Sequence, residues 1–119
     1  MRDEKRDKGF RKKEKIIFEN DVIFYLRRLI HRLYLDEYFY SIVAREDYVE
    51  RIIDYINENI EQSQHKKAPT ELFYLGEYYM FYNANSSTTW FIFFYRKNND
   101  FLISGILNNH VEESNRLNQ

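Results

Sequence analysis

The stretch 88–110 reads TTWFIFFYRKNNDFLISGILNNH, and it decides the fold of this chain. Two runs rich in aromatic and β-branched residues flank Asn98-Asn99-Asp100, three residues of the types that form tight turns. The stretch therefore predicts an antiparallel hairpin with strands at 88–97 and 101–107. It ends in Asn-Asn-His, so His110 is either a working residue or the polar end of a strand.

Both faces of the first predicted strand are apolar, because side chains alternate between the two sides of a sheet. One face carries Trp90, Ile92, Phe94 and Arg96. The other carries Phe91, Phe93, Tyr95 and Lys97. The same alternation in the second strand separates Phe101, Ile103, Gly105 and Leu107 from Leu102, Ser104 and Ile106. A sheet with this pattern needs a cover on both faces.

Upstream of the hairpin, the apolar residues recur with the period of an α-helix. After a short strand expected at 15–19, apolar residues three and four positions apart predict amphipathic helices over about 22–35 and about 44–62. The first helix has a basic outer row of Arg27, Arg28, His31 and Arg32. The second has an acidic outer row of Glu46, Glu50 and Asp54. We therefore expect an antiparallel helical hairpin with ion pairs between the helices, each contributing about 0–1 kcal/mol.

The remaining segments complete an α+β order. A polar linker is expected at 62–69, a short strand at 71–75 and a longer strand at 77–83. The chain thus predicts one strand, two helices and then a three- to four-stranded antiparallel sheet, with the helical hairpin packed on one face. The whole would form a single domain over 16–119.

The second face of this sheet is the feature that the two helices leave unexplained. It remains apolar and aromatic, and exposed apolar patches beyond a few hundred Å² usually mark an interaction surface. Four covers are possible: a protein partner, a second copy of the chain in a homodimer, stacked nucleic-acid bases, or the chain's own termini. We favour a protein partner.

Composition narrows the class of protein. The chain has 119 residues, enough for one core, with 44% hydrophobic and 31% charged residues and no cysteine. There is no apolar run of the roughly 20 residues that a membrane helix needs, and no signal-peptide pattern, so a cytoplasmic protein is expected. Residues 1–15 hold eight basic and four acidic residues, whereas the remainder holds ten and fifteen. A basic arm at 1–15 therefore precedes an acidic body.

The runs KIIFENDVIFYLRRLI (15–30) and YVERIIDYINENI (48–60), followed by EYYMFY, TTWFIFFYRK and FLISGILNNH, resemble the RelE/ParE superfamily of toxins from type II toxin–antitoxin systems. The resemblance covers about residues 14–112 and rests on the order of the elements and on the residue patterns within them. It implies a domain that inhibits growth and is neutralised by a cognate antitoxin wrapped over its surface, which would cover the second face. RelE-like members cut mRNA on the ribosome, and ParE-like members poison DNA gyrase.

Metal-free RNA cleavage needs a base, an acid and cations for the developing charge. RelE-like nucleases supply these from the sheet and from near the C-terminus. The residues placed there by position are His110, Arg96 and Tyr82 for catalysis, and Tyr78, Lys97, Asn108 and Asn109 for binding. The acidic body argues against a ribonuclease. The favoured interpretation of His110 is a surface residue that ends a strand, with catalysis and a contact to the target or antitoxin as the alternatives. Three scattered histidines give no metal-site pattern, so no metal or cofactor is expected.

Two hypotheses of different classes follow from the sequence. The first is a toxin acting on the ribosome and its mRNA, or on DNA gyrase. The second is a non-enzymatic protein-binding module of the same fold, such as an inactive relative or an immunity-type partner.

Overall fold

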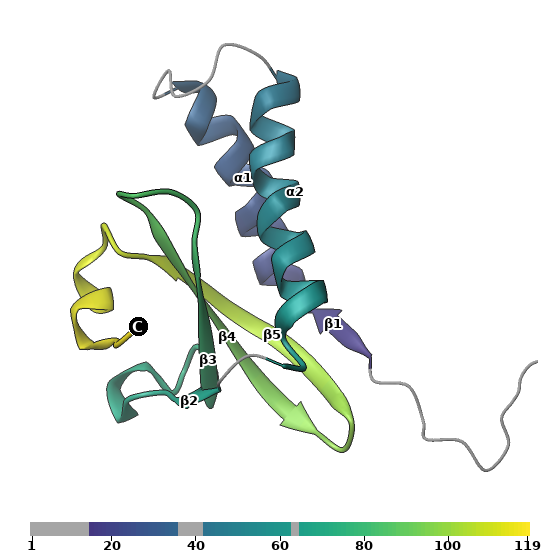
Figure 1. Cartoon of the computed structure of the whole chain (residues 1–119), viewed down its shortest axis with the longest axis vertical. Helices are drawn as coiled ribbons and strands as arrows, with labels where there is room; N and C mark the ends of the chain where they lie inside the picture. The colour runs from purple at the N-terminus through teal and green to yellow at the C-terminus, as the bar shows by residue number, and fades with distance from the viewer. Residues whose placement is uncertain (1–14, 36–41, 63–64) are drawn as a thin grey trace, which may run out of the picture.

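The computed structural model describes residues 15–35, 42–62 and 65–119, with the side chains of 30–35 and 42–45 left out. Most of the expected basic arm, the 36–41 connector and the side chains of His31 and Arg32 thus lie outside the described residues. The elements are β1 (Ile16–Phe18), α1 (Asn20–Leu35), α2 (Ile42–Asn59), β2 (Lys66–Lys67), η1 (Thr70–Leu72), β3 (Tyr78–Asn83), β4 (Thr89–Lys97), β5 (Asp100–Asn108) and η2 (Glu112–Arg116). Figure 1 shows their arrangement.

The predicted α+β class is confirmed, with two helices and a five-stranded sheet in the described part of the chain. The strand order is β1-β5-β4-β3-β2, and every neighbouring pair is antiparallel except β1 and β5, which are parallel. The sheet is therefore mixed rather than purely antiparallel. None of the described helices is long and apolar enough to cross a membrane.

The two helices lie side by side and share one core with a single face of the sheet (Figure 1). The buried stripe of each helix faces the strands, as the 3–4 spacing predicts. This core consists of Val22, Leu26, Leu29, Val49, Ile52, Ile56, Ile60, Met80, Trp90, Ile92, Phe94, Phe101, Ile103 and Ile106. The indole Nε1 of Trp90 donates a hydrogen bond of 2.9 Å to the Tyr48 hydroxyl, which ties β4 to α2.

A β-bulge in β5 changes which of its residues enter this core. Phe93 is paired with Gly105, but Phe94 is paired with Ile103, so Ser104 is the extra residue. A bulge reverses the alternation of side chains beyond it. Ile106 therefore joins Phe101 and Ile103 in the core, and the expected face made of Phe101, Ile103, Gly105 and Leu107 is wrong.

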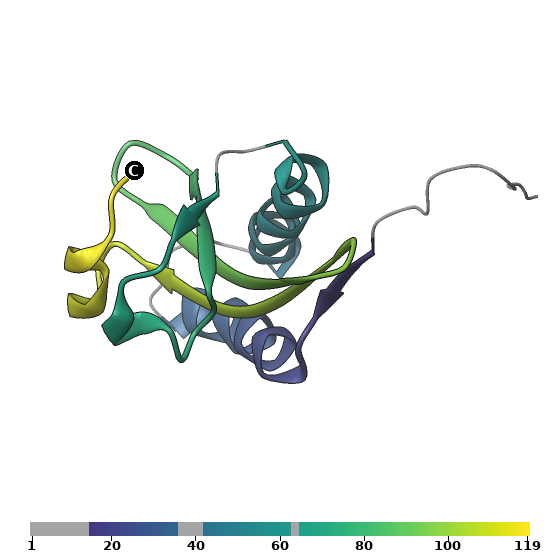
Figure 2. The same cartoon turned by 90° about the horizontal axis from the view of Figure 1, so that it is seen from below.

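The second face of the sheet is covered by the chain itself. A segment that we call the strap (residues 66–76, comprising β2, η1 and the turn to Gly76) crosses it, and residues 112–119 complete the cover (Figure 2). The resulting second core contains Ala68, Leu72, Tyr79, Phe91 and Phe93, with Leu75, Phe81, Leu107 and Leu117 packed against it. The favoured protein partner is thus replaced as the cover of this face. Residues 112–119 belong to the alternative of the chain's own termini, whereas the strap is an internal segment that none of the four alternatives named.

The strap also corrects the strand expected at 71–75. Pro69 has the extended backbone that precedes a turn, and its carbonyl accepts a hydrogen bond of 2.9 Å from the Leu72 amide, so η1 forms instead. Leu72 and Leu75 are three positions apart, and a 3₁₀ turn brings such residues to the same side. The expected linker at 62–69 likewise contains β2, which pairs with β3.

Candidate functional site

The Asn-Asn-His end of β5 is held in a network of hydrogen bonds with the start of β4. The Asn109 side chain accepts a bond of 2.9 Å from the Thr89 amide and donates one of 3.1 Å to the Ser87 carbonyl. The Asn108 side chain accepts one of 2.8 Å from the His110 amide. His110 Nε2 is hydrogen-bonded to Thr88 Oγ1 over 3.1 Å, and its side chain is exposed. These hydrogen bonds join the end of β5 to the start of β4.

The two cations of the predicted site lie at the other end of the hairpin. Arg96 is paired with Phe101 and Lys97 with Asp100, next to the turn at Asn98. The guanidinium of Arg96 lies 5.1 Å from the centre of the Phe101 ring. Asn108 is paired with Trp90, and a rise of about 3.3 Å per residue puts roughly 20 Å of strand between Trp90 and Arg96.

The two tyrosines of the predicted site are partly buried and pack against the helix-side core. The Tyr82 ring stacks on Tyr55 of α2 with 4.5 Å between ring centres. The Tyr78 ring stacks on Phe94 with 6.0 Å between centres. Tyr82 thus lies at the same end of the sheet as His110, whereas Tyr78 is paired with Phe94, two residues from Arg96. The structure does not gather His110, Arg96 and Tyr82 into one site, so these three side chains do not converge on a common point.

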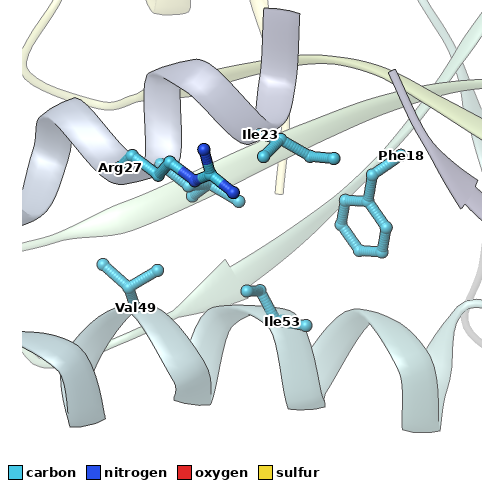
Figure 3. Close-up of a pocket in the computed structure, with 6 residues that line it drawn as sticks. Phe18, Ile23, Arg27, Val49 and Ile53 are labelled. Carbon is cyan, nitrogen blue, oxygen red and sulfur yellow. The ribbon is translucent and has the colours of Figure 1, made fainter. Parts of the chain in front are cut away.

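A groove lies between the two helices. Its volume is about 300 Å³, and it is lined by Phe18, Ile23, Leu26, Arg27, Val49 and Ile53. Figure 3 shows the α1 and α2 side chains facing each other across the groove. The apolar side chains of Ile17 and Phe24 are exposed, the second by 62%. An open apolar groove of this kind suits the side chains of another molecule.

The groove was missed because it depends on how far apart the helices lie. Val49 and Ile53 belong to the predicted buried stripe of the second helix, but Ile23 and Phe24 lie just beside the stripe of the first. These two side chains were the available signal, since an apolar stripe wider than one helix partner needs indicates a second contact.

The expected ion pairs between the helices do not form among the described side chains. Arg27 lines the groove, and no acidic side chain of α2 that the structure describes lies within 4 Å of it or of Arg28. Within the described ranges, the ion pair present joins Arg116 of η2 to Glu71 of η1 at 3.1 Å. The reason is that apolar residues occupy the boundary between α1 and α2, which keeps the charged rows apart.

His65 packs against the sheet, although a polar linker is expected at this position. Its ring packs edge-on against Phe94 and Phe101, with ring centres 4.8 and 5.7 Å apart. Its Nε2 is hydrogen-bonded to the Ile60 carbonyl, so this nitrogen carries the proton. Among the described residues, no three His, Asp or Glu side chains are grouped closely enough to hold a metal ion.

The comparisons with known proteins add no relative: no family model matches the chain, and no curated protein or solved structure matches it either. The class that the fold and the groove define is therefore a small α+β protein with a mixed sheet and an apolar groove between two helices.

Proposed function

We propose that this chain is a growth-inhibiting toxin of the RelE/ParE kind, which acts by binding a protein target and is neutralised by a cognate antitoxin. The observation that carries the proposal is the open apolar groove between α1 and α2, in which the Ile23 side chain is partly exposed. Such a surface is suited to an apolar segment of a partner. The order β-α-α-β-β-β-β shares with the resemblance a first strand, a pair of helices and a following run of strands.

Binding is favoured over RNA cleavage as the toxic action. A general base must lie within hydrogen-bond reach of its substrate, and stabilising cations must surround the same phosphate. His110 and Arg96 lie at opposite ends of the β4–β5 hairpin, and the partly buried Tyr82 ring stacks on Tyr55 of α2. The proposed mode of action is therefore the ParE-like one, in which the toxin binds DNA gyrase. The groove is the proposed binding site of the antitoxin.

The first test is growth of a bacterial host after induction of the chain, with and without a small protein encoded beside it. We expect arrest without the neighbour and rescue with it. Replacing the groove residue Ile23, which is 37% exposed, by Glu should leave the arrest intact and weaken the rescue, because a charge in the groove opposes burial of apolar side chains. Glu58→Gln, at an exposed position on α2, is the matched control and should be rescued normally. Harmless overexpression would refute the toxin and leave a non-enzymatic binding module.

The second test separates binding from cleavage. His110→Ala and Arg96→Ala should each keep full toxicity, and message recovered from an in vitro translation reaction should be intact while gyrase–DNA complexes accumulate. Cleaved message, together with loss of toxicity in both variants, would establish a ribonuclease and overturn the proposed mode of action.

A further inference from the structure

Two adjacent aromatic side chains on the strap point away from the core. The strap residues Leu72 and Leu75 face inward, whereas Phe73 is 39% exposed and Tyr74 is 70% exposed. Tyr74 makes no hydrogen bond within the described part of the chain. Aromatic rings carry a large apolar surface that is normally buried, so folding alone does not account for this pair.

The strap that carries the pair is held rigidly. The Ser104 hydroxyl donates a hydrogen bond of 2.6 Å to the Leu75 carbonyl, and the Tyr95 hydroxyl donates one of 3.2 Å to the Phe73 carbonyl. A Cβ atom on Gly76 would lie 2.7 Å from the Phe94 amide nitrogen, so the strap backbone packs directly on the sheet. The aromatic rings are therefore presented in a fixed position, which lowers the entropic cost of binding a ligand.

One lysine lies beside the Phe73 ring, and a second follows Tyr95 on β4. The Lys67 ammonium lies 5.9 Å from the centre of the Phe73 ring. Tyr95, bonded to the Phe73 carbonyl, is 37% exposed, and Lys97 follows two residues later on the same side of β4, about 7 Å along the strand. We call Lys67, Phe73, Tyr74, Tyr95 and Lys97 the aromatic–basic patch. Both lysines are exposed, and among the described side chains neither has a carboxylate within 4 Å.

Three carboxylates lie in or next to the strap and at the β4–β5 turn, and of these Asp100 is paired with Lys97 across the hairpin. Glu71 is paired with Arg116. Glu77 is half-buried where the strap meets β3. Asp100 accepts a hydrogen bond of 3.3 Å from the Lys15 amide. The patch thus offers aromatic faces beside cations, without exposed aliphatic side chains of its own.

We infer that the aromatic–basic patch binds single-stranded nucleic acid. Bases stack on exposed aromatic rings, and the phosphates that connect them are neutralised by lysines beside the rings. A duplex hides the faces of its bases, and an acidic peptide lacks them, so neither ligand uses both features of the patch. The inference is independent of the proposed toxin action, because the patch lies on the strap rather than in the groove.

The test is fluorescence anisotropy of the full chain with labelled single-stranded RNA and DNA of one mixed sequence, a duplex of that sequence, and a polyglutamate peptide. We expect the chain to bind the single strands more tightly than the duplex or the peptide. The difference in affinity between single-stranded RNA and DNA shows whether the sugar contributes to binding. Tyr74→Ala should weaken single-strand binding about fivefold or more, and Tyr74→Phe should restore it, because stacking needs the ring and not the hydroxyl. Lys97→Ala should reduce the salt dependence of binding by about one phosphate contact.

The matched control is Phe24→Ala. Phe24 is also an exposed ring beside a cation, since the Arg28 guanidinium lies 5.8 Å from its centre, but it belongs to α1. This variant should bind like the original chain, and thermal unfolding should show that every variant is folded. Equal binding of the polyglutamate peptide or of the duplex, no binding of single strands, or equal losses in Tyr74→Ala and Phe24→Ala would each overturn the inference.

Discussion

His65 shows how a polar residue becomes structural through its position. It lies between the end of α2 and the start of β2, where its ring contacts Phe94 and Phe101 and its Nε2 donates to the Ile60 carbonyl. That carbonyl is one of those that the end of a helix leaves without a partner. His65 therefore caps α2 and fills part of the core, whereas His110 is exposed and bonded to Thr88.

Replacing His65 by Ala should lower the free energy of unfolding by about 1–3 kcal/mol, because the Ile60 carbonyl loses its donor and the two phenylalanines lose a ring contact. Chemical denaturation measures the change. His110→Ala is the control and should cost about 0.5 kcal/mol or less, since its side chain is exposed. Equal losses in the two variants would contradict the capping role of His65.

Gly76 is a second residue whose identity is set by close packing. A Cβ atom there would lie 2.8 Å from the Phe93 Cβ as well as 2.7 Å from the Phe94 amide nitrogen. Gly76→Ala should therefore destabilise the chain by about 1–3 kcal/mol, because the strap has to move off the sheet. Tyr74→Ala, on the exposed side of the same strap, should have little effect. A thermal unfolding midpoint that stays unchanged in Gly76→Ala would show that the strap does not pack this closely.

Among the elements, the β4–β5 hairpin depends on two local departures from regular geometry. The bulge at Ser104 directs Ile106 into the helix-side core. The turn places Asn98 in the left-handed region, with φ of 57°. Asparagine tolerates this conformation better than other non-glycine residues, and a β-branched residue does not.

Two substitutions at Asn98 should therefore differ in their effect on the free energy of unfolding. Asn98→Val should destabilise the hairpin by about 1–2 kcal/mol, because a left-handed backbone crowds its Cβ atom. Asn98→Gly should be neutral or slightly stabilising. Equilibrium unfolding in denaturant measures both. A valine variant as stable as the glycine variant would mean that the turn adopts another conformation.

The molecule as a whole consists of a sheet between two unlike covers. Two helices cover one face, and the strap together with residues 112–119 covers the other. The C-terminal cover is fastened by Tyr79, whose hydroxyl donates to the Asn118 carbonyl and accepts from the Asn118 amide, both at 3.0 Å. Leu117 packs against the second core beside this bond.

Deleting residues 112–119 should expose part of the second core and leave the Tyr79 hydroxyl without these two bonds. We expect a lower unfolding midpoint and increased binding of a dye that reports exposed apolar surface. Arg116→Ala, which removes only the exposed ion pair with Glu71, should cost about 0–1 kcal/mol. A truncated chain that is as stable as the full one, without dye binding, would show that the C-terminal segment is not part of the cover.

The local patterns of the sequence were enough for the class of fold. The 3–4 spacing placed both helices, the alternation and the turn residues placed β3, β4 and β5, and the aromatic residues on both faces of β4 required two covers. These features depend on neighbours in the chain, and their physical causes act over a few residues. The identity of the second cover, the parallel pairing of β1 with β5, the bulge at Ser104 and the groove could not be predicted in this way. They depend on contacts between residues far apart in sequence. The separation of Arg96 from His110, by contrast, already follows from the predicted hairpin, because Arg96 stands just before the turn at 98–100 and His110 follows the far end of the second strand.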